Sequence, residues 1–364
     1  MRTWIIAVLV LGALFYAVSA RADHGITPFN IPSDSLTDGL PVSAVTHDPY
    51  PGKQFGETWT LTGMTDSGWM IFAQLIVSST GLSNFFPGYS LTIISPDGIA
   101  VIETAEFESE ELIAADEHVY VQFGPALLKG THPRYHLRID ADRISCDLLI
   151  TAQGPGFMAG DGKVNFDNGR FMKVSWPAPD ARIEGTLTMD GKPVNASGWA
   201  DLDHLVQNIL GPIFAESWTS LHVHANDLDI IVFGFEAKKS YGRKPIYLAL
   251  VCEGGRNLAA TTDVIVDKRD YAVEAYSGRS IPRRIEVRAD GAEFGMSFFF
   301  GGDYVIHRFI VLEKLNPITA GIVKRLVANP IYIRTYSKVI LHLEMNGVSR
   351  TTPAQVLGQF IYMH

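Results

Sequence analysis

The sequence predicts an all-β fold, a sandwich or barrel made of many short strands with few short helices. One observation is the frequency of turn-forming residues, because 33 glycines and 19 prolines separate short segments rich in Val, Ile, Thr, Phe and Tyr. Another is spacing, because such segments recur roughly every 8–12 residues with turn signals between them. A third is length, because 364 residues exceed the size at which one hydrophobic core usually stops growing. We therefore expect two barrel-like β-domains with a boundary near residues 177–180.

In the first half, residues 69–78 (WMIFAQLIVS) form an apolar run that is too continuous for a strand with one solvated face. Asp190-Gly191 separates two strand-like runs and predicts a hairpin. The other strands expected here are residues 89–95, 99–104, 118–123, 135–141, 143–151, 182–189 and 192–196.

In the second half, Asn226-Asp227 and Asp290-Gly291 are predicted turns between strands. The strands expected here are residues 219–224, 229–236, 246–252, 259–267, 283–289, 292–300, 304–313, 339–346 and 356–362. Two helices are expected, one over residues 316–327 and a short one over residues 203–210, in which Asp203 would be the N-cap.

The N-terminus has the three parts of a secretion signal: Arg2, an apolar run over residues 4–18, and small residues in Ala20-Arg21-Ala22 before Asp23. The apolar run is shorter than the roughly 20 residues needed to span a bilayer. We expect cleavage after residue 22, export to a periplasm or secretory space, and a soluble product. The domain prediction is a signal peptide over residues 1–22 and β-domains over 23–178 and 179–364.

Removal of residues 1–22 leaves 342 residues with a formal net charge of −11, because Arg2 and Arg21 are lost. An acidic chain without a run of Lys and Arg is a poor binder of polyanions, so nucleic acid is not expected as a partner. Cys146 and Cys252 form either one disulfide or two buried thiols in strands, and the second alternative is favoured. Neither cysteine has a second Cys or His at zinc-ligand spacing, and no cofactor is expected.

The densest group of polar and aromatic residues lies between Trp199 and Asp229. Acid catalysis on a polyene needs a carboxylic acid kept protonated in an apolar pocket, with aromatic faces that stabilise positive charge. Asp201 or Asp203 beside Trp199 and Trp218 could supply this. The alternative is structural, with Asp203 capping a helix and Asp227 in a turn.

His222 and His224 alternate by two, so they are expected on one face of one strand. Such a pair could bind a metal together with Asp203 or Glu216, but no third ligand has diagnostic spacing, and a hydrogen-bonded role is favoured. There is no Gly-x-Ser-x-Gly motif, and the glycine-rich residues 154–162 lack the ending of a phosphate loop.

Several short motifs follow one another along the chain: Phe72-Ala73-Gln74 before an apolar, Ser-containing end, Gly154-Pro155-Gly156-Phe157, Trp176-Pro177 with Ile183-Glu184-Gly185-Thr186, Gly198-Trp199-Ala200-Asp201, and Asn329-Pro330-Ile331-Tyr332-Ile333-Arg334-Thr335-Tyr336. In this order they resemble motifs of the survival-factor and carotenoid 1,2-hydratase (hydroxyneurosporene synthase) superfamily. The resemblance covers residues 58–363. It implies two tandem lipocalin-like β-domains and an apolar cavity or groove for a long hydrophobic molecule.

In the survival-factor branch the resemblance implies a sphingolipid of the ceramide type that is moved between membranes. In other branches it implies hydration of carotenoid double bonds or ring closure of polyenes. The enzyme members place His directly after the signature Asp, whereas Leu202 follows Asp201 here and the Asp-His pair is Asp203-His204. This departure favours a binding protein over an enzyme.

The leading hypothesis is an exported carrier of a ceramide-like or other long-chain lipid, with transient membrane contact as one way of loading it. Interior apolar positions of both barrels would line the cavity, and few polar groups would hold the head group. The ligand-binding residues expected are Gln74, Trp176, Trp199, Trp218 and His222, with Asp201 at the mouth. The alternatives are a hydratase or cyclase acting on an isoprenoid or polyene, with Asp201 or Asp203 as the acid, and a structural envelope protein without a ligand.

Overall fold

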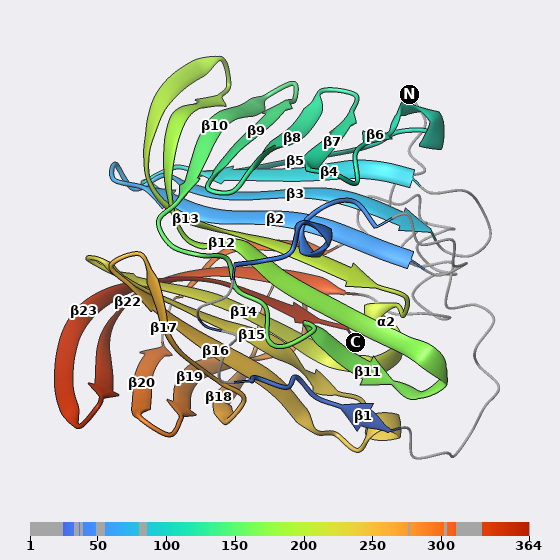
Figure 1. The fold of residues 1–364 in the computed structure, drawn as a ribbon. Coiled ribbons are helices and arrows are strands. Elements are labelled where there is room, and N and C mark those ends of the chain that lie inside the picture. The colour runs from blue at the N-terminus through green and yellow to red at the C-terminus, as the bar shows by residue number, and fades with distance from the viewer. Residues whose placement is uncertain are drawn as a thin grey trace.

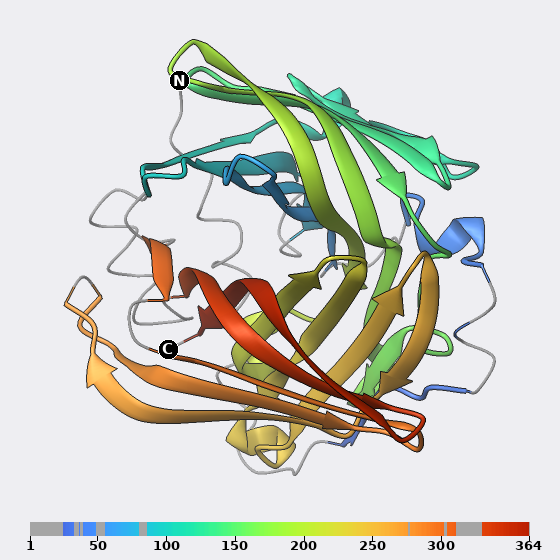
Figure 2. The ribbon, with the colours of Figure 1, turned by 90° about the vertical axis from the view of Figure 1, so that its left-hand side faces the viewer.

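The computed structural model describes residues 25–32, 36, 39–48, 55–79, 86–275, 277–301, 304–310 and 330–363. These residues form two large antiparallel sheets that lie one above the other (Figures 1 and 2). The all-β prediction is confirmed. The predicted signal peptide and the predicted helix over residues 316–327 lie outside the described residues.

The first sheet has 13 strands, in the order β5-β4-β3-β2-β13-β12-β10-β9-β8-β7-β6, with β11 also beside β12 and β1 beside β11. Figure 2 shows how it curls around its own interior. Its strands are β1 (Ile26–Thr27), β2 (Phe55–Thr65), β3 (Met70–Ser79), β4 (Phe86–Ile94), β5 (Ala100–Glu106), β6 (Ile113–Ala114), β7 (Val119–Phe123), β8 (Ala126–Thr131), β9 (Arg134–Asp140), β10 (Ile144–Ala152), β11 (Lys163–Phe166), β12 (Arg170–Met189) and β13 (Lys192–Gln207).

The second sheet has 10 strands, in the order β17-β16-β15-β14-β23-β22-β20-β19-β18, with β21 beside β22. The last strand, β23, therefore lies in the middle of its sheet. The strands are β14 (Ala215–Ala225), β15 (Leu228–Ala237), β16 (Pro245–Glu253), β17 (Arg256–Thr261), β18 (Val264–Val273), β19 (Ser280–Asp290), β20 (Phe294–Gly301), β21 (Val305–Ile310), β22 (Ile331–Met345) and β23 (Val348–Tyr362).

Turn chemistry fixes the register of the longest hairpin. Asp190 and Gly191 have φ values of 50° and 76°, and both sit between β12 and β13, where Met189 pairs with Lys192. A two-residue turn with positive φ at both positions matches the twist of its strands, which explains the Asp-Gly pair. Asn226 also has a positive φ, of 58°, in the turn between β14 and β15. These predicted turns are confirmed.

Several predicted elements differ from the observed ones. Residues 203–207 belong to β13 and not to a helix, because β13 pairs with β2 on one side and β12 on the other and buries both of its faces. Asp203 is therefore no N-cap, and the short helix α2 (Gly211–Phe214) begins later, with a proline in its first turn. The strand predicted over residues 259–267 is two strands, β17 and β18. Four 3-10 turns complete the described elements: Val42–Ala44, Ser109–Glu111, Asp167–Gly169 and Lys239–Tyr241.

Four apolar clusters hold the fold together. One fills the interior of the first curled sheet and another fills the interior of the second. The other two lie between the sheets: one is built around Trp176, Phe214 and Phe235, and the other joins Phe72 and Trp199 of the first sheet to Leu357 of the second. The sheets thus share a buried interface, and burial of apolar side chains is the main force that holds them together.

The chain passes from the first sheet to the second at α2, whereas the predicted domain boundary at residues 178/179 lies inside β12.

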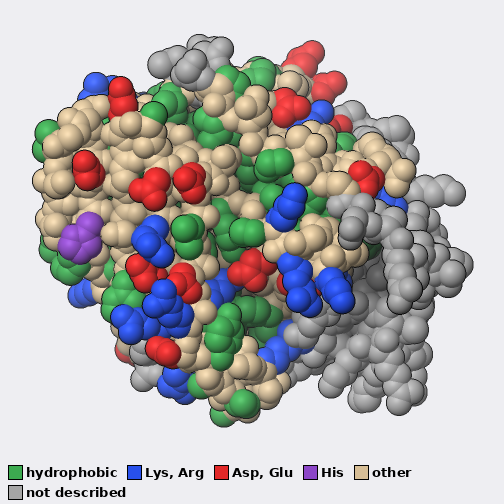
Figure 3. Space-filling model, turned by 90° about the horizontal axis from the view of Figure 1, so that it is seen from below, with side chains coloured by type: hydrophobic (Ala, Val, Ile, Leu, Met, Phe, Trp, Pro, Cys, Tyr) green, Lys and Arg blue, Asp and Glu red, His purple; other side chains and the backbone are tan. Residues whose placement is uncertain are grey.

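Cys146 in β10 and Cys252 in β16 are buried free thiols, as the favoured alternative expected. In the described part of the chain, no helix is long and apolar enough to cross a membrane. On the face seen from below, Lys and Arg side chains lie intermixed with Asp and Glu (Figure 3).

Candidate functional site

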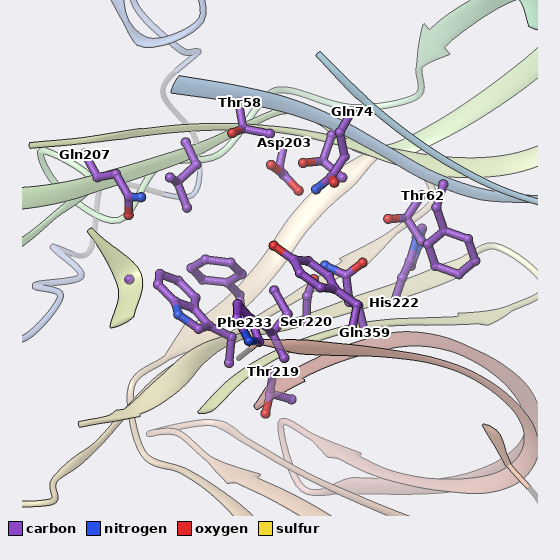
Figure 4. A pocket seen from close by; sticks show the side chains of 18 of the residues that line it. Thr58, Thr62, Gln74, Asp203, Gln207, Thr219, Ser220, His222, Phe233 and Gln359 are labelled. Atoms are coloured by element: carbon purple, nitrogen blue, oxygen red, sulfur yellow. The ribbon is translucent and has the colours of Figure 1, made fainter. Parts of the chain in front are cut away.

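A cavity of about 190 Å³ lies between the two sheets (Figure 4). The first sheet contributes Thr58, Thr60, Thr62, Phe72, Gln74, Asp201, Asp203, Leu205 and Gln207. The second sheet and its neighbouring segments contribute Gly211, Pro212, Trp218, Thr219, Ser220, His222, Phe233, Pro330, Tyr332, Gln359, Ile361 and Met363. Both sheet interiors are filled by their own apolar clusters, so the expectation that interior barrel positions line the cavity is wrong.

The polar side chains of the first sheet stand in rows across three strands. Asp203 pairs with Thr60, and Thr60 pairs with Gln74, so this row crosses β13, β2 and β3. Because side chains alternate along a strand, the even-numbered residues of β2 face the cavity, whereas Trp59 and Leu61 face the interior of the first sheet. The result is a wall of hydroxyl, amide and carboxyl groups on one side of the cavity (Figure 4).

The opposite wall is built in the same way. Ser220 of β14 pairs with Gln359 of β23, and Trp218 pairs with Ile361. Phe233 of β15 lies opposite Ser220 and packs its ring 5.8 Å from that of Trp218. This wall is therefore apolar around Trp218 and becomes polar toward Gln359 and His222.

A buried charge network joins the sheets at one end of the cavity. Nδ1 of His222 lies 2.9 Å from Oδ1 of Asp201, and Nε2 lies 2.7 Å from Oδ1 of Asp229. Although burial disfavours the imidazolium, the charge of Asp201 and the hydrogen bonds to both carboxylates raise the pKa of His222 to about 10. His222 is therefore a cation at neutral pH and donates from both ring nitrogens.

Asp229 is the shared acceptor of two histidines, because Nδ1 of His224 lies 3.0 Å from the same oxygen. Although burial opposes ionisation, the hydrogen bonds from His222 and His224 lower the pKa of Asp229 to about 2. Asp180 of β12 adds a fifth group, and burial together with the charge of Asp229 raises the pKa of Asp180 to about 7. Trp199 closes the network, with its ring stacked 4.8 Å from that of His224.

Asp203 differs chemically from Asp201, its neighbour on the same strand face. Burial and the charge of Asp201 raise the pKa of Asp203 well above its ordinary value, and a hydrogen bond with Thr60 offsets only part of this effect. Burial therefore favours the neutral form of Asp203 at the cavity wall, while Asp201 accepts a hydrogen bond from His222.

Five of the seven predicted site residues line this cavity: Gln74, Asp201, Asp203, Trp218 and His222. The other two lie elsewhere. Trp176 is 1% exposed and packs against Phe157 and Phe233 in the core between the sheets. Trp199 packs on His222 and His224, behind the cavity wall.

Other lining residues were missed in the sequence. The alternation of Thr58, Thr60 and Thr62 with Trp59 and Leu61 is a period-2 signal that could have identified both β2 and its cavity face. Gln359 carries no local signal, because strand pairing alone brings it to the site.

The two histidines of β14 are on one face, as predicted, since both contact Asp229. Among the described residues, no group of three or more His, Cys, Asp or Glu is arranged to hold a metal ion. His204 faces away from the cavity, with its ring stacked 4.7 Å from that of Trp59 and its Nε2 atom 2.8 Å from Oε1 of Glu57. The Asp203-His204 pair is therefore split between two faces of β13.

Comparisons with solved structures agree with this architecture. A putative AttH from Nitrosomonas europaea has a TM-score of 0.61 at 13% identity, covering 92% of this chain and 99% of that one. CghA in complex with Sch210972 has a TM-score of 0.61 at 13% identity, covering 94% and 99%. Kievitone hydratase from Nectria haematococca has a TM-score of 0.58 at 11% identity, covering 92% and 97%. These similarities show a shared fold.

The ceramide-binding protein svf1 of Schizosaccharomyces pombe is 22% identical over 187 residues, which are 49% of this chain and 48% of that protein. The chain thus spans about half the length of the curated relative that it matches. The Svf1 family model matches residues 50–351, which include β2 to β22 and every cavity-lining residue of the first sheet. The expected resemblance is confirmed, and the chain belongs to the Svf1 family.

Proposed function

We propose that this chain binds a long-chain lipid in the cavity between its sheets and carries it without chemical change. The observation that carries this proposal is the cavity itself, which has an apolar wall around Trp218 and Phe233 and a polar wall around Gln74. Ligand sites of this kind combine apolar contact area with a few placed polar groups. Ceramide is the first candidate ligand, because a relative in the same family binds it.

The size of the cavity limits how the lipid is held. At about 190 Å³ it is smaller than the roughly 300–1,000 Å³ of sites that enclose a drug-sized ligand. A head group or part of one acyl chain fits this space, so a long-chain lipid requires that its remainder lie outside or that the sheets move apart.

We further propose that the chain carries its lipid outside the cytoplasm, in a periplasm or secretory space. The support for this is the signal-like sequence ending at Ala20-Arg21-Ala22. The mature protein is expected to begin at Asp23, and N-terminal sequencing of the native protein tests this. An intact Met1 terminus that stays with membranes after high-salt washing contradicts it.

Mass spectrometry of organic extracts from the purified protein tests lipid binding directly. Added ceramide at 100 times its dissociation constant is expected to stabilise the protein by about 2.7 kcal/mol, which raises the thermal midpoint measurably. Gln74→Leu should lower lipid occupancy, because Gln74 lines the cavity. Gln122→Leu is the matched control, since Gln122 is half-buried on β7 and lies outside the lining. Extracts without lipid, together with a thermal midpoint that ceramide does not move, contradict the proposal.

A second candidate function is acid catalysis on a polyene or isoprenoid, as in a hydratase or cyclase. The observation that favours it is the position of Asp203 on the cavity wall, where burial raises the pKa of its carboxyl group. A neutral carboxylic acid in such a place can donate a proton to an alkene. Asp201 is a less suitable candidate for the catalytic acid than Asp203, because its Oδ1 atom already accepts a hydrogen bond from His222.

A further inference from the structure

One buried cation beside the cavity has no acceptor among the described residues. Arg334 lies in β22 and is 3% exposed. Its Nε and Nη1 atoms are buried without a hydrogen-bond partner in the described part of the chain. Burial lowers the pKa of Arg334 to about 9, and no carboxylate contributes to that pKa. Arg308 of the neighbouring β21 is different, because its Nε atom lies 2.9 Å from Oε1 of Glu274.

The strand register places Arg334 at the edge of the cavity. It pairs with Gln359, and Gln359 pairs with Ser220, both of which line the cavity. Tyr332, two residues earlier on β22, also lines it, so Arg334 is on the same face of its strand. The guanidinium carbon lies 4.6 Å from the ring centroid of Phe72, a lining residue of the opposite sheet.

The described neighbours of Arg334 on β21 offer it no negative charge. His307 pairs with Arg334 across β21 and β22. Burial together with the charges of Arg334 and Arg308 lowers the pKa of His307 to about 4. An uncompensated buried charge is costly, and removal of one partner from a buried ion pair destabilises a protein for the same reason. A ligand that supplies the missing negative charge removes this cost.

We propose that Arg334 is the head-group site of the cavity and that the ligand it selects is a single-chain carboxylate, a long-chain fatty acid. This inference rests on the proposed lipid binding and specifies the head group. A guanidinium offers parallel N–H groups that match the two oxygens of a carboxylate. One cation is neutralised by one negative charge, and a cavity of about 190 Å³ takes the carboxylate and the first part of a single chain. The apolar wall formed by Trp218, Phe233 and Ile361 receives that chain.

Binding of oleate and of oleyl alcohol to the delipidated full chain tests the inference, because the two lipids share a chain and differ in charge. Titration calorimetry should show that oleate binds at least ten times more tightly than the alcohol. Arg334→Met should abolish this preference, and Arg334→Lys should retain part of it, because lysine keeps the charge without the planar fork. Lys338→Met is the matched control, since Lys338 is exposed on the same strand, and it should leave both affinities unchanged.

The ligand-free variants supply a second readout. If the buried charge of Arg334 lacks a counter-charge in the ligand-free protein, ligand-free Arg334→Met should have a higher thermal midpoint than the wild type. Oleate should then no longer stabilise the variant. Equal affinities for oleate and oleyl alcohol, or an unchanged preference in Arg334→Met, overturn the assignment of Arg334. Ceramide binding measured in the same series tests the proposed lipid binding separately, because ceramide carries no negative charge that Arg334 could select.

Discussion

Nδ1 of His222 lies 2.9 Å from Oδ1 of Asp201, and this contact connects the two sheets through a buried ion pair. His222 belongs to β14 of the second sheet and Asp201 to β13 of the first. On its other side the imidazole ring faces Asp229 at 2.7 Å, so one cation lies between two carboxylates. The geometry fixes the relative position of the sheets at the end of the cavity that carries the charged groups.

Replacement of His222 by glutamine should therefore destabilise the protein strongly. The variant leaves Asp201 and Asp229 buried without their shared cation, and loss of one partner of a buried ion pair costs about 3–5 kcal/mol. Urea denaturation measures the free energy of unfolding. His342→Gln is the control, because His342 is exposed on β22, and it should change that free energy by less than about 0.5 kcal/mol. A loss in His222→Gln no larger than in His342→Gln contradicts the bridging role.

The same pair predicts a pH dependence. The folded-state pKa of His222, about 10, lies above its ordinary value of 6.5, so the stability that it contributes is fully present below pH 6.5 and is lost as the pH rises toward 10. The difference in unfolding free energy between the wild type and His222→Gln should fall between pH 7 and pH 9. Its slope should approach about −1.4 kcal/mol per pH unit, the value for one proton. A difference that is flat or rises over this range shows that His222 is not the buried cation.

Much of the fold could be predicted because its signals are local. The continuous apolar run of β3 indicated a strand with two buried faces, and the structure shows Phe72 and Gln74 at the cavity while Ile71 and Ala73 face the sheet interior. The Asp190-Gly191 turn could be predicted because Asp-Gly pairs favour the positive φ values that a two-residue hairpin turn requires. The strand character of residues 203–207 was missed, because an Asp before an apolar segment resembles a helix start, and only pairing with β2 and β12 decides otherwise.

The site could be predicted only in part, for a related reason. Asp201, Asp203 and His222 were found because they are close in sequence and chemically distinctive. Arg334 and Gln359 were not found, because strand pairing and sheet packing bring them to the site. The glycine of the Gly198-Trp199-Ala200-Asp201 motif has a packing reason that only the structure shows: a Cβ atom there would lie 2.1 Å from the carbonyl oxygen of Met64.

Asp203→Asn separates a carrier from an enzyme. The substitution keeps the shape of the side chain and removes the transferable proton, and since burial raises the pKa of Asp203 and so favours its neutral form, the unfolding free energy should change by less than about 1 kcal/mol. For a carrier, lipid occupancy stays within a few-fold of the wild type. For a hydratase, occupancy also stays but turnover falls by roughly 100-fold or more. Incubation of the wild type with polyenes in heavy-oxygen water is expected to give no labelled product. If the wild type forms a labelled product and Asp203→Asn does not, the carrier proposal is contradicted.

Glu57 supports a second buried network, which holds the segment before β2 against the first sheet. Its side chain is fully buried and accepts hydrogen bonds from Nε2 of His204 at 2.8 Å, from Nδ1 of His47 at 2.5 Å and from the Asp48 backbone N–H at 2.9 Å. Three donors therefore converge on one carboxylate. His204 also contacts the carbonyl oxygen of Ala44 through Nδ1, at 2.9 Å, so the network fixes residues 44–48 from two sides.

Glu57→Gln should destabilise the protein by about 3–5 kcal/mol, because one carboxylate oxygen becomes an NH2 group that faces donors and the histidines lose their counter-charge. Although burial opposes ionisation, the hydrogen bonds from His204 and His47 lower the pKa of Glu57, so its contribution is present above the ordinary pKa of 4.5 and is lost as the pH falls. The difference in unfolding free energy between the wild type and Glu57→Gln should accordingly shrink from pH 6 to pH 3, whereas the difference between the wild type and His222→Gln shrinks at alkaline pH.

Hydrogen exchange at the Asp48 amide should accelerate in Glu57→Gln and stay unchanged in Glu117→Gln, the exposed control. Equal protection of the Asp48 amide in wild type and Glu57→Gln would show that residues 44–48 are held by other contacts.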